Sequence, residues 1–333
     1  MKWNLAGHDW AAALLKEHIA RGQVRHAYLF SGPPGVGRRS LALRFAQALN
    51  CPQAPHPGEP CGTCRTCRQF ERQQHPDLSI VQAEGGSREI RIDQIRALQH
   101  RLALAPYEAR FRIGLLLHFQ DANANAQNAL LKTLEEAPEK VILLLTADTP
   151  EGLLPTIASR CEILRLRPLP VEEAVRFLAS LKGMDPAQAT RLAHLSSGRV
   201  GYARRLQEDP GELARRGETL SKLLELLETP IRRRFEYADR LTREWGKGRE
   251  NLYQAMQVWL SAWRDILLCA SGSSAPLVNI EREPELRALA GNLELPAVRK
   301  IVADLEAGLE KLEANANPRL LAEILFLGMP RIN

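Results

Sequence analysis

The sequence has no apolar run long enough to cross a membrane and no segment typical of a signal peptide. Its longest apolar stretches, such as 141–145, are far shorter than the roughly 18–20 residues that a spanning helix needs. Asp9 and Glu17 interrupt the amino-terminal segment, where a signal peptide has an unbroken apolar core. The sequence therefore predicts a cytoplasmic protein without a membrane span.

The sequence also lacks internal repeats, low-complexity tracts and blocks of like charge. Of its 333 residues, 45% are hydrophobic and 25% are charged, and both values are typical of globular proteins. A chain of this length exceeds an ordinary single domain, so two or three domains are expected. Most of the formal net charge of +6 lies in residues 1–168, where the basic residues are scattered rather than grouped, and by itself it identifies no acidic partner.

Apolar stretches alternate with amphipathic ones up to about residue 168. This alternation predicts βαβ units and an α/β fold with a parallel sheet covered by helices on both faces, as in P-loop NTPases. Strands are expected at 27–30, 78–82, 111–119 and 140–148, and helices at 39–49, 92–104 and 126–138.

The strand pattern fades after Pro168 and Pro170, and helical patterns follow. We expect an α/β module over 1–168, a small helical domain over 169–208 and an all-α domain over 209–333. Apolar residues at helical spacing, among them Trp259 and Trp263, are expected to form the core of the last domain.

A glycine-rich loop at 32–39 has the scaffold of a phosphate-binding loop without its chemistry. Gly32, Gly35 and Gly37 stand where backbone amides could wrap a phosphate. Arg38 replaces the motif lysine, and Arg39 replaces the hydroxyl residue that would bind Mg²⁺. Phosphate or nucleotide binding by this loop is left open, whereas hydrolysis is not expected.

The acidic pair of an active ATPase is also missing. The apolar run that should end in Asp-Glu ends instead in His118, Phe119, Gln120 and Asp121. Asp121 lies about three residues past the expected strand end, so a structural role is favoured over Mg²⁺ binding. His118 has no neighbouring ligand residue, and a packing role is favoured for it.

Four of the six cysteines, Cys51, Cys61, Cys64 and Cys67, fall within an insert at 50–68. Four thiolates in a C-x₉-C-x₂-C-x₂-C pattern can surround one tetrahedral zinc ion and leave no open position, so a structural site is predicted. Disulfides are disfavoured in a reducing compartment. The insert is rich in proline and glycine, so a metal is expected to hold it together.

Several segments, in order along the whole chain, carry a family resemblance. The sequence resembles the delta prime family of bacterial DNA polymerase III clamp-loader subunits, which are AAA+ proteins. The segments that carry the resemblance are 26–32, 128–136, 153–157, 159–161 and 317–319.

The resemblance implies a role for the Ser-Arg-Cys segment. In this family the arginine reaches the ATP of an adjacent subunit, so Arg160, preceded by Ser159, is implied to be an arginine finger that acts in trans. From the residues alone, an ion pair with a nearby carboxylate such as Glu162 is favoured instead.

The resemblance further implies a helical lid, a collar domain that assembles with other subunits, and a set of partners. These partners are the gamma/tau ATPase subunits and the delta subunit, and indirectly the beta sliding clamp and primed template DNA. The family's Asp-Glu pair would fall on Leu117 and His118, and its polar sensor on Ala147 or Asp148. The expected protein is thus a subunit of an enzyme complex that neither hydrolyses nor binds ATP.

Two alternatives stay open at this point. The first is an ATPase-active clamp-loader subunit of the gamma/tau type, against which Arg38 and the missing acidic pair count. The second is a zinc-containing DNA-binding protein on the same fold, which salt-sensitive DNA binding by the lone chain would favour.

Overall fold

The computed structural model describes residues 3, 5–84, 89–243 and 247–332. The chain divides into two compact units, Met1–Phe177 with Gly198–Tyr202, and Leu178–Ser197 with Ala203–Asn333. The residues expected to form the lid, 169–208, are shared between these units, and a separate lid domain stays a prediction. Among the described residues, none of the helices is both long and apolar enough to span a bilayer.

The first unit contains a five-stranded parallel sheet in the order β2-β3-β4-β1-β5. The predicted α/β fold is thereby confirmed, and the four strands expected from apolar stretches are present. The strands are β1 (Ala27–Ser31), β2 (Leu78–Val81), β3 (Arg112–Leu116), β4 (Val141–Ala147) and β5 (Glu162–Arg165).

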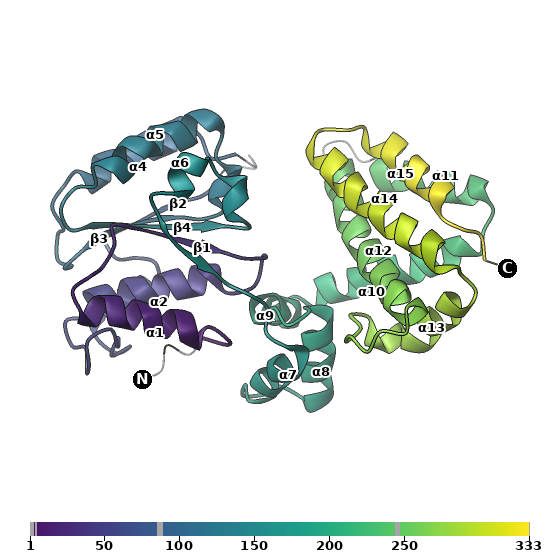
Figure 1. Cartoon of the computed structure of the whole chain (residues 1–333), viewed down its shortest axis with the longest axis horizontal. Coiled ribbons are helices and arrows are strands. Elements are labelled where there is room, and N and C mark those ends of the chain that lie inside the picture. Colours follow the sequence, from purple (N-terminus) through teal and green to yellow (C-terminus); the bar gives the residue numbers. More distant parts are fainter. Residues whose placement is uncertain (1–2, 4, 85–88, 244–246, 333) are drawn as a thin grey trace. The chain divides into compact units, whose positions relative to one another are not determined.

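Helices cover both faces of the sheet because alternate strand residues point to opposite sides. Tyr28 and Phe30 pack toward α1 (Asp9–Ala20) and α2 (Arg38–Asn50), whereas Leu29 belongs to the core on the other face. That face is covered by α4 (Ile92–Leu102), α5 (Ala124–Glu135) and the short α6 (Pro155–Ala158), as Figure 1 shows. Helix α3 (Arg65–Glu71) packs on α2.

Parallel pairing brings the carboxyl ends of β1, β3 and β4 to one edge of the sheet. Ser31 is in register with Ala147, and Leu116 with Leu145. The glycine-rich loop follows β1, and η1 (Phe119–Asp121) and η2 (Pro150–Gly152) follow β3 and β4. The segments that could form a nucleotide site therefore meet at this edge.

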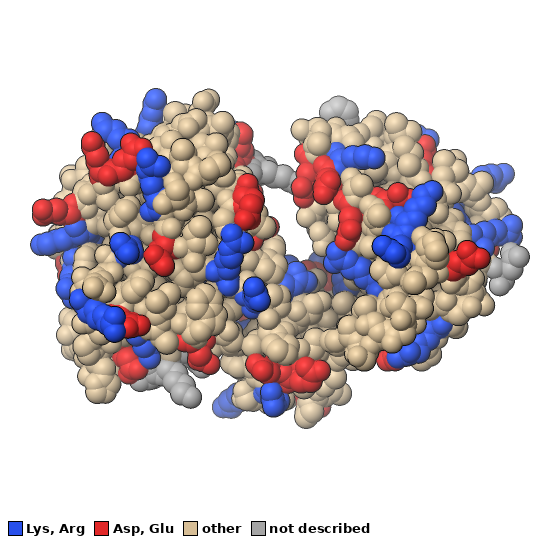
Figure 2. Space-filling model, in the orientation of Figure 1, with Lys and Arg blue, Asp and Glu red and all other residues tan. Residues whose placement is uncertain are grey.

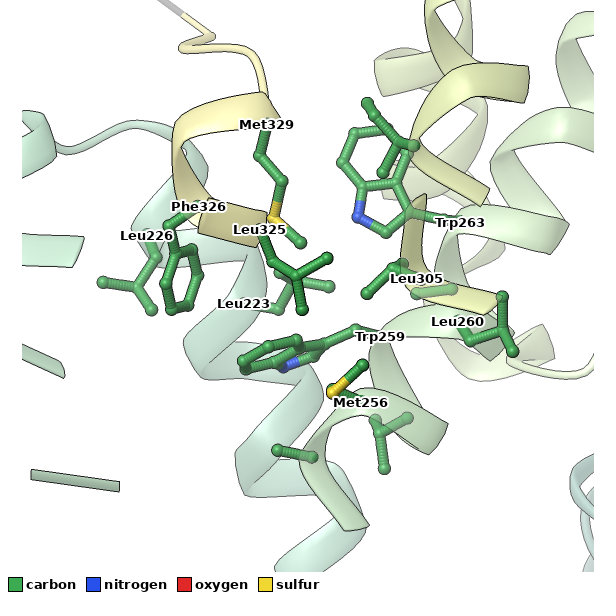
Figure 3. Packing of buried hydrophobic residues seen from close by; sticks show 14 of the residues in the cluster. Leu223, Leu226, Met256, Trp259, Leu260, Trp263, Leu305, Leu325, Phe326 and Met329 are labelled. Carbon is green, nitrogen blue, oxygen red and sulfur yellow. The ribbon is translucent and has the colours of Figure 1, made fainter. Parts of the chain in front are cut away.

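The second unit is helical. Its core contains the predicted Trp259 and Trp263, which are fully buried among side chains that include Leu223, Leu305 and Leu325 (Figure 3). Its helices are α8 (Pro186–Leu195), α10 (Pro210–Leu227), α11 (Ile231–Thr242), α12 (Gly248–Ala270), α13 (Glu283–Gly291), α14 (Leu295–Glu313) and α15 (Pro318–Gly328), with η3 (Ile280–Arg282) before α13. Two further helices, α7 (Val171–Ala179) and α9 (Val200–Glu208), have residues in both units.

A buried arginine ties together the carboxyl ends of two of these helices. Arg234, on α11, is only 2% exposed, and its guanidinium donates to the carbonyls of Leu226 and Leu227 at the end of α10. It also donates to Phe326 near the end of α15, and to Met329 and Pro330 beyond it. Burial lowers the pKa of Arg234.

Basic and acidic side chains are interspersed on the face of the molecule drawn in Figure 2. Several ion pairs join residues one turn apart on a helix, such as Arg232 with Glu236 and Arg287 with Glu283. This mixture agrees with the sequence, in which the positive excess forms no block.

Candidate functional sites

The glycine-rich loop has the backbone of a phosphate-binding loop. Gly32, Gly35 and Gly37 all have positive φ, and Gly37 precedes the first turn of α2. The carbonyl of Gly35 accepts a hydrogen bond of 2.9 Å from the amide of Gly201, and a side chain on Gly35 would lie 2.7 Å from Cβ of Tyr202. Glycine is required here by close packing as well as by backbone angle.

Arg38, in the place of the motif lysine, is engaged inside the protein. It is only 5% exposed, and its Nη1 lies 2.5 Å from Oδ1 of Asp148, just past the end of β4. Its Nη2 lies 3.5 Å from Nδ1 of His118. The positive charge that a phosphate would meet in an active loop is therefore already neutralised by a carboxylate.

Arg39 points away from the edge of the sheet. It is exposed, and it donates a hydrogen bond to Gln73 in the segment after α3. The position that supplies a Mg²⁺-binding hydroxyl in an active loop thus holds a cation that is directed elsewhere.

The residues after β3 also differ from those at the corresponding place in an active ATPase. Leu117 is buried, and His118 has a left-handed backbone whose amide donates to Oγ1 of Thr146 at 2.8 Å. The packing role predicted for His118 is wrong, because its side chain is exposed at the sheet edge beside Arg38. The backbone carbonyl of Asp121 accepts from the Ile90 amide at 2.9 Å, and the structural role expected for its side chain stays a prediction.

Arg160 lies just after the end of α6, in a short segment, residues 154–161, that we call the arginine platform. Its Nη1 donates to the carbonyl of Thr156 at 3.0 Å, and Oγ of Ser159 donates to the same carbonyl at 3.2 Å. Nη2 of Arg160 donates to Oε1 of Glu135 at 2.8 Å, while 36% of the side chain is exposed. The next residue, Cys161, packs against the core, and burial raises the pKa of its thiol to about 12. Arg160 therefore lies between Ser159, which is hydrogen-bonded to Thr156, and Cys161, which packs against the core.

Helix α5 makes hydrogen bonds to both ends of the arginine platform. Asn123 caps the start of α5, and one turn later Gln127 accepts a hydrogen bond of 2.9 Å from the amide of Leu154, just before α6. At the other end of α5, Glu135 holds Arg160. The partner of Arg160 is thus Glu135 rather than the nearby Glu162, because α5 and α6 pack against each other.

The four predicted cysteines come together. Their Sγ atoms all lie within 4.8 Å of one another, and those of Cys61 and Cys67 are 3.9 Å apart. A tetrahedral ion with Zn–S bonds of about 2.3 Å places its sulfurs about 3.8 Å apart, so the cluster fits such an ion. The amide of Cys64 donates to Sγ of Cys61 and, as the largest cause, lowers the pKa of Cys61 to about 6.

The cysteine insert is more ordered than its composition indicates. Cys64 caps α3, and Cys67 and Phe70 of this helix are buried. The proline-rich part is held at Gly58, whose carbonyl accepts from Nε1 of Trp3 at 2.9 Å, and at Glu59, which pairs with Lys16 at 2.7 Å. Burial raises the pKa of the Cys67 thiol.

The parallel sheet, the glycine loop ahead of α2 and the helical second unit define a protein of the AAA+ class. Comparison with known proteins gives the family. The profile of the family described as "DNA polymerase III, delta subunit" matches residues 7–170. The chain is 30% identical to DNA polymerase III subunit delta' of Bacillus subtilis over 94% of this chain and 93% of that protein.

Two further relatives match shorter parts of the chain. Subunit delta' of Pseudomonas aeruginosa is 36% identical over 67% of this chain and 68% of its own length. Subunit tau of Escherichia coli is 36% identical over 51% of this chain and 26% of its own length. The chain belongs to the delta prime family of DNA polymerase III clamp-loader subunits.

Proposed function

We propose that this chain is a non-hydrolysing clamp-loader subunit that supplies an arginine to the ATP site of a neighbouring subunit. It would assemble with gamma/tau-type ATPase subunits and a delta subunit in the cytoplasm, and the complex would load the beta clamp onto primed DNA. The observation that carries the proposal is a contrast between two sites. The Arg160 platform is intact and exposed, whereas Arg38 of the chain's own loop is paired internally.

The absence of ATP hydrolysis is supported by replacements at three positions where an active ATPase has its motif residues. Arg38 is paired with Asp148, Arg39 is directed to Gln73, and His118 stands where a general base is expected. Hydrolysis needs a bound metal ion and a base or a water-positioning residue, and these residues supply neither. ATP turnover by the purified chain would contradict this part of the proposal.

The arginine finger is supported by exposure and geometry. A guanidinium stabilises the charge that develops on a transferring phosphoryl group, and it can be supplied by an adjacent subunit. Arg160 keeps part of its side chain exposed while two hydrogen bonds hold it at the end of α6. Such a group is both accessible and restrained.

Assembly would use the second unit, and an exposed apolar stripe on α15 is our candidate surface. Leu320, Ile324 and Leu327 are 57%, 55% and 63% exposed, and their spacing places them along one face of the helix. Exposed apolar stripes of this kind mark protein contacts in folded domains.

The test of the proposed function is reconstitution. When the purified chain is mixed with its host's gamma/tau and delta subunits, one complex of defined mass is expected by size exclusion with light scattering. The double variant Leu320→Glu and Ile324→Glu should stay folded and weaken assembly at least tenfold, because it places charges in an apolar contact. The matched variant Arg287→Glu, on the exposed surface of α13, should assemble normally. No complex with the unaltered chain would contradict the proposed function.

We further propose that the cysteine cluster holds a structural zinc ion. The four thiols would supply a complete tetrahedral shell, with no position left for water or substrate. The ion would fix the insert against α2 and α1 and would take no part in the chemistry of ATP.

The purified chain should contain one zinc ion, and Cys64→Ser should remove it, because three thiolates bind zinc far more weakly than four. Metal analysis by mass spectrometry measures the content, and proteolysis within 51–71 should become faster when zinc is lost. Cys269→Ser is the matched control, because Cys269 lies on α12 outside the cluster. Full zinc content in Cys64→Ser would contradict the assignment.

A further inference from the structure

We propose that Glu135 is a positioning residue for the arginine finger: it holds the Arg160 guanidinium ready for the phosphate of the neighbouring subunit. The inference rests on the proposed function of Arg160 and adds a residue to it. Its basis is the 2.8 Å contact between Oε1 of Glu135 and Nη2 of Arg160.

The place of Glu135 in α5 argues for a role beyond helix stability. It is the last residue of the helix, and Glu136 follows it as the cap. Carboxylates near a helix carboxyl end interact unfavourably with the helix dipole, and cations are preferred there. Glu135 is also about half exposed, so its ion pair adds little to folding. The effect of the Glu135 carboxylate is therefore to fix the direction of the Arg160 side chain.

The geometry leaves the guanidinium able to bind a phosphate. A guanidinium has five N–H donors, of which one on Nη1 is directed to Thr156 and one on Nη2 to Glu135. Three donors, one each on Nε, Nη1 and Nη2, are not used by these two contacts. A side chain held in this way loses less conformational freedom when the transition state forms, which is how positioning raises a rate.

The two anchors differ in kind. The Thr156 contact is made to a backbone carbonyl four residues before Arg160, so substitution of the Thr156 side chain cannot remove it. The Glu135 contact comes from another helix and can be removed by one change. Because Gln127 of α5 also fixes the amide before α6, the whole arginine platform depends on this helix.

The experiment uses the reconstituted complex and a double-mutant cycle. Glu135→Gln is expected to lower kcat for ATP about two- to fivefold, the range that an exposed ion pair supports, with KM unchanged. Glu136→Gln is the matched control and should leave kcat unchanged, since it removes the adjacent carboxylate and not the contact. In an Arg160→Ala complex, Glu135→Gln should have no further effect. Raising the salt concentration should reduce the difference between Glu135→Gln and the unaltered complex.

The outcomes separate this inference from the proposed function. An Arg160→Ala complex with full ATPase activity overturns both. If Arg160→Ala lowers activity while Glu135→Gln leaves kcat unchanged or raises it, only the positioning role is overturned. An equal loss from Glu135→Gln with and without Arg160 also overturns it, since a general structural effect would act in both backgrounds.

Discussion

Replacing Arg160 by alanine should lower ATP turnover at the neighbouring site on the order of 10³-fold, because arginine fingers contribute at least this much to phosphoryl transfer. Clamp loading by the reconstituted complex should fall with it. The isolated chain should keep its melting temperature, since an exposed ion pair such as Arg160 with Glu135 contributes about 1 kcal/mol at most. ATPase assays on the complex and thermal unfolding of the chain provide the two measurements.

The matched control is Arg165→Ala. Arg165 is also exposed on the same unit and also pairs with a carboxylate, that of Glu151 at 3.2 Å. It lies on β5, and its replacement should leave turnover unchanged. Arg160→Lys should restore only part of the activity, because an ammonium group lacks the planar fork of the guanidinium. Equal losses from Arg160→Ala and Arg165→Ala would refute a specific role for Arg160.

Arg234→Met should destabilise the second unit by about 3 kcal/mol, because each buried carbonyl left without a donor costs about 1–3 kcal/mol. The carbonyls of Phe326, Met329 and Pro330 would lose the Arg234 donor in a buried place, whereas those of Leu226 and Leu227 keep donors from Thr229 and Ile332. Urea unfolding can be followed by the fluorescence of Trp259 and Trp263, which lie in the same core. Hydrogen exchange along α15 should accelerate.

The neighbouring Arg233 offers the control, because it lies on the same helix and is exposed. Arg233→Met should change the free energy of unfolding by less than about 0.5 kcal/mol, as is usual for surface positions. Arg234→Lys should give an intermediate loss, since lysine has three donors instead of five. A loss below about 1 kcal/mol for Arg234→Met would show that other groups or water satisfy these carbonyls.

The strands were predictable because buried parallel strands are nearly continuous apolar runs, as in 141–145. The cysteine cluster was predictable for a local reason: three of its members follow one another at three-residue spacing, and the fourth is close in sequence. Helices α1 and α3 were not predicted. Helix α3 was missed because its cysteines suggest only metal ligands. In the structure Cys64 also caps the helix, and Cys67 and Phe70 form its buried face.

The contacts that matter most at the candidate sites join residues far apart in the chain. The loss of the motif lysine was visible in Arg38, yet its partner Asp148 lies 110 residues away. For Arg160 the sequence suggested only a nearby carboxylate such as Glu162, because the contact with Glu135 depends on how α5 packs against α6. His118 was misjudged because the turn that exposes it follows from the left-handed backbone at the strand end.

The ion pair between Arg38 and Asp148 has a consequence for competition. A carboxylate attached to the same chain is present at this place at every ATP concentration, so it competes with any phosphate that enters the loop. A phosphate entering the loop would have to displace Asp148, and its apparent affinity would be reduced to the fraction of time for which the pair is open. The chain thus carries its own competitor for phosphate, tethered at the loop, and a phosphate would bind there more weakly than in a loop whose cation is free.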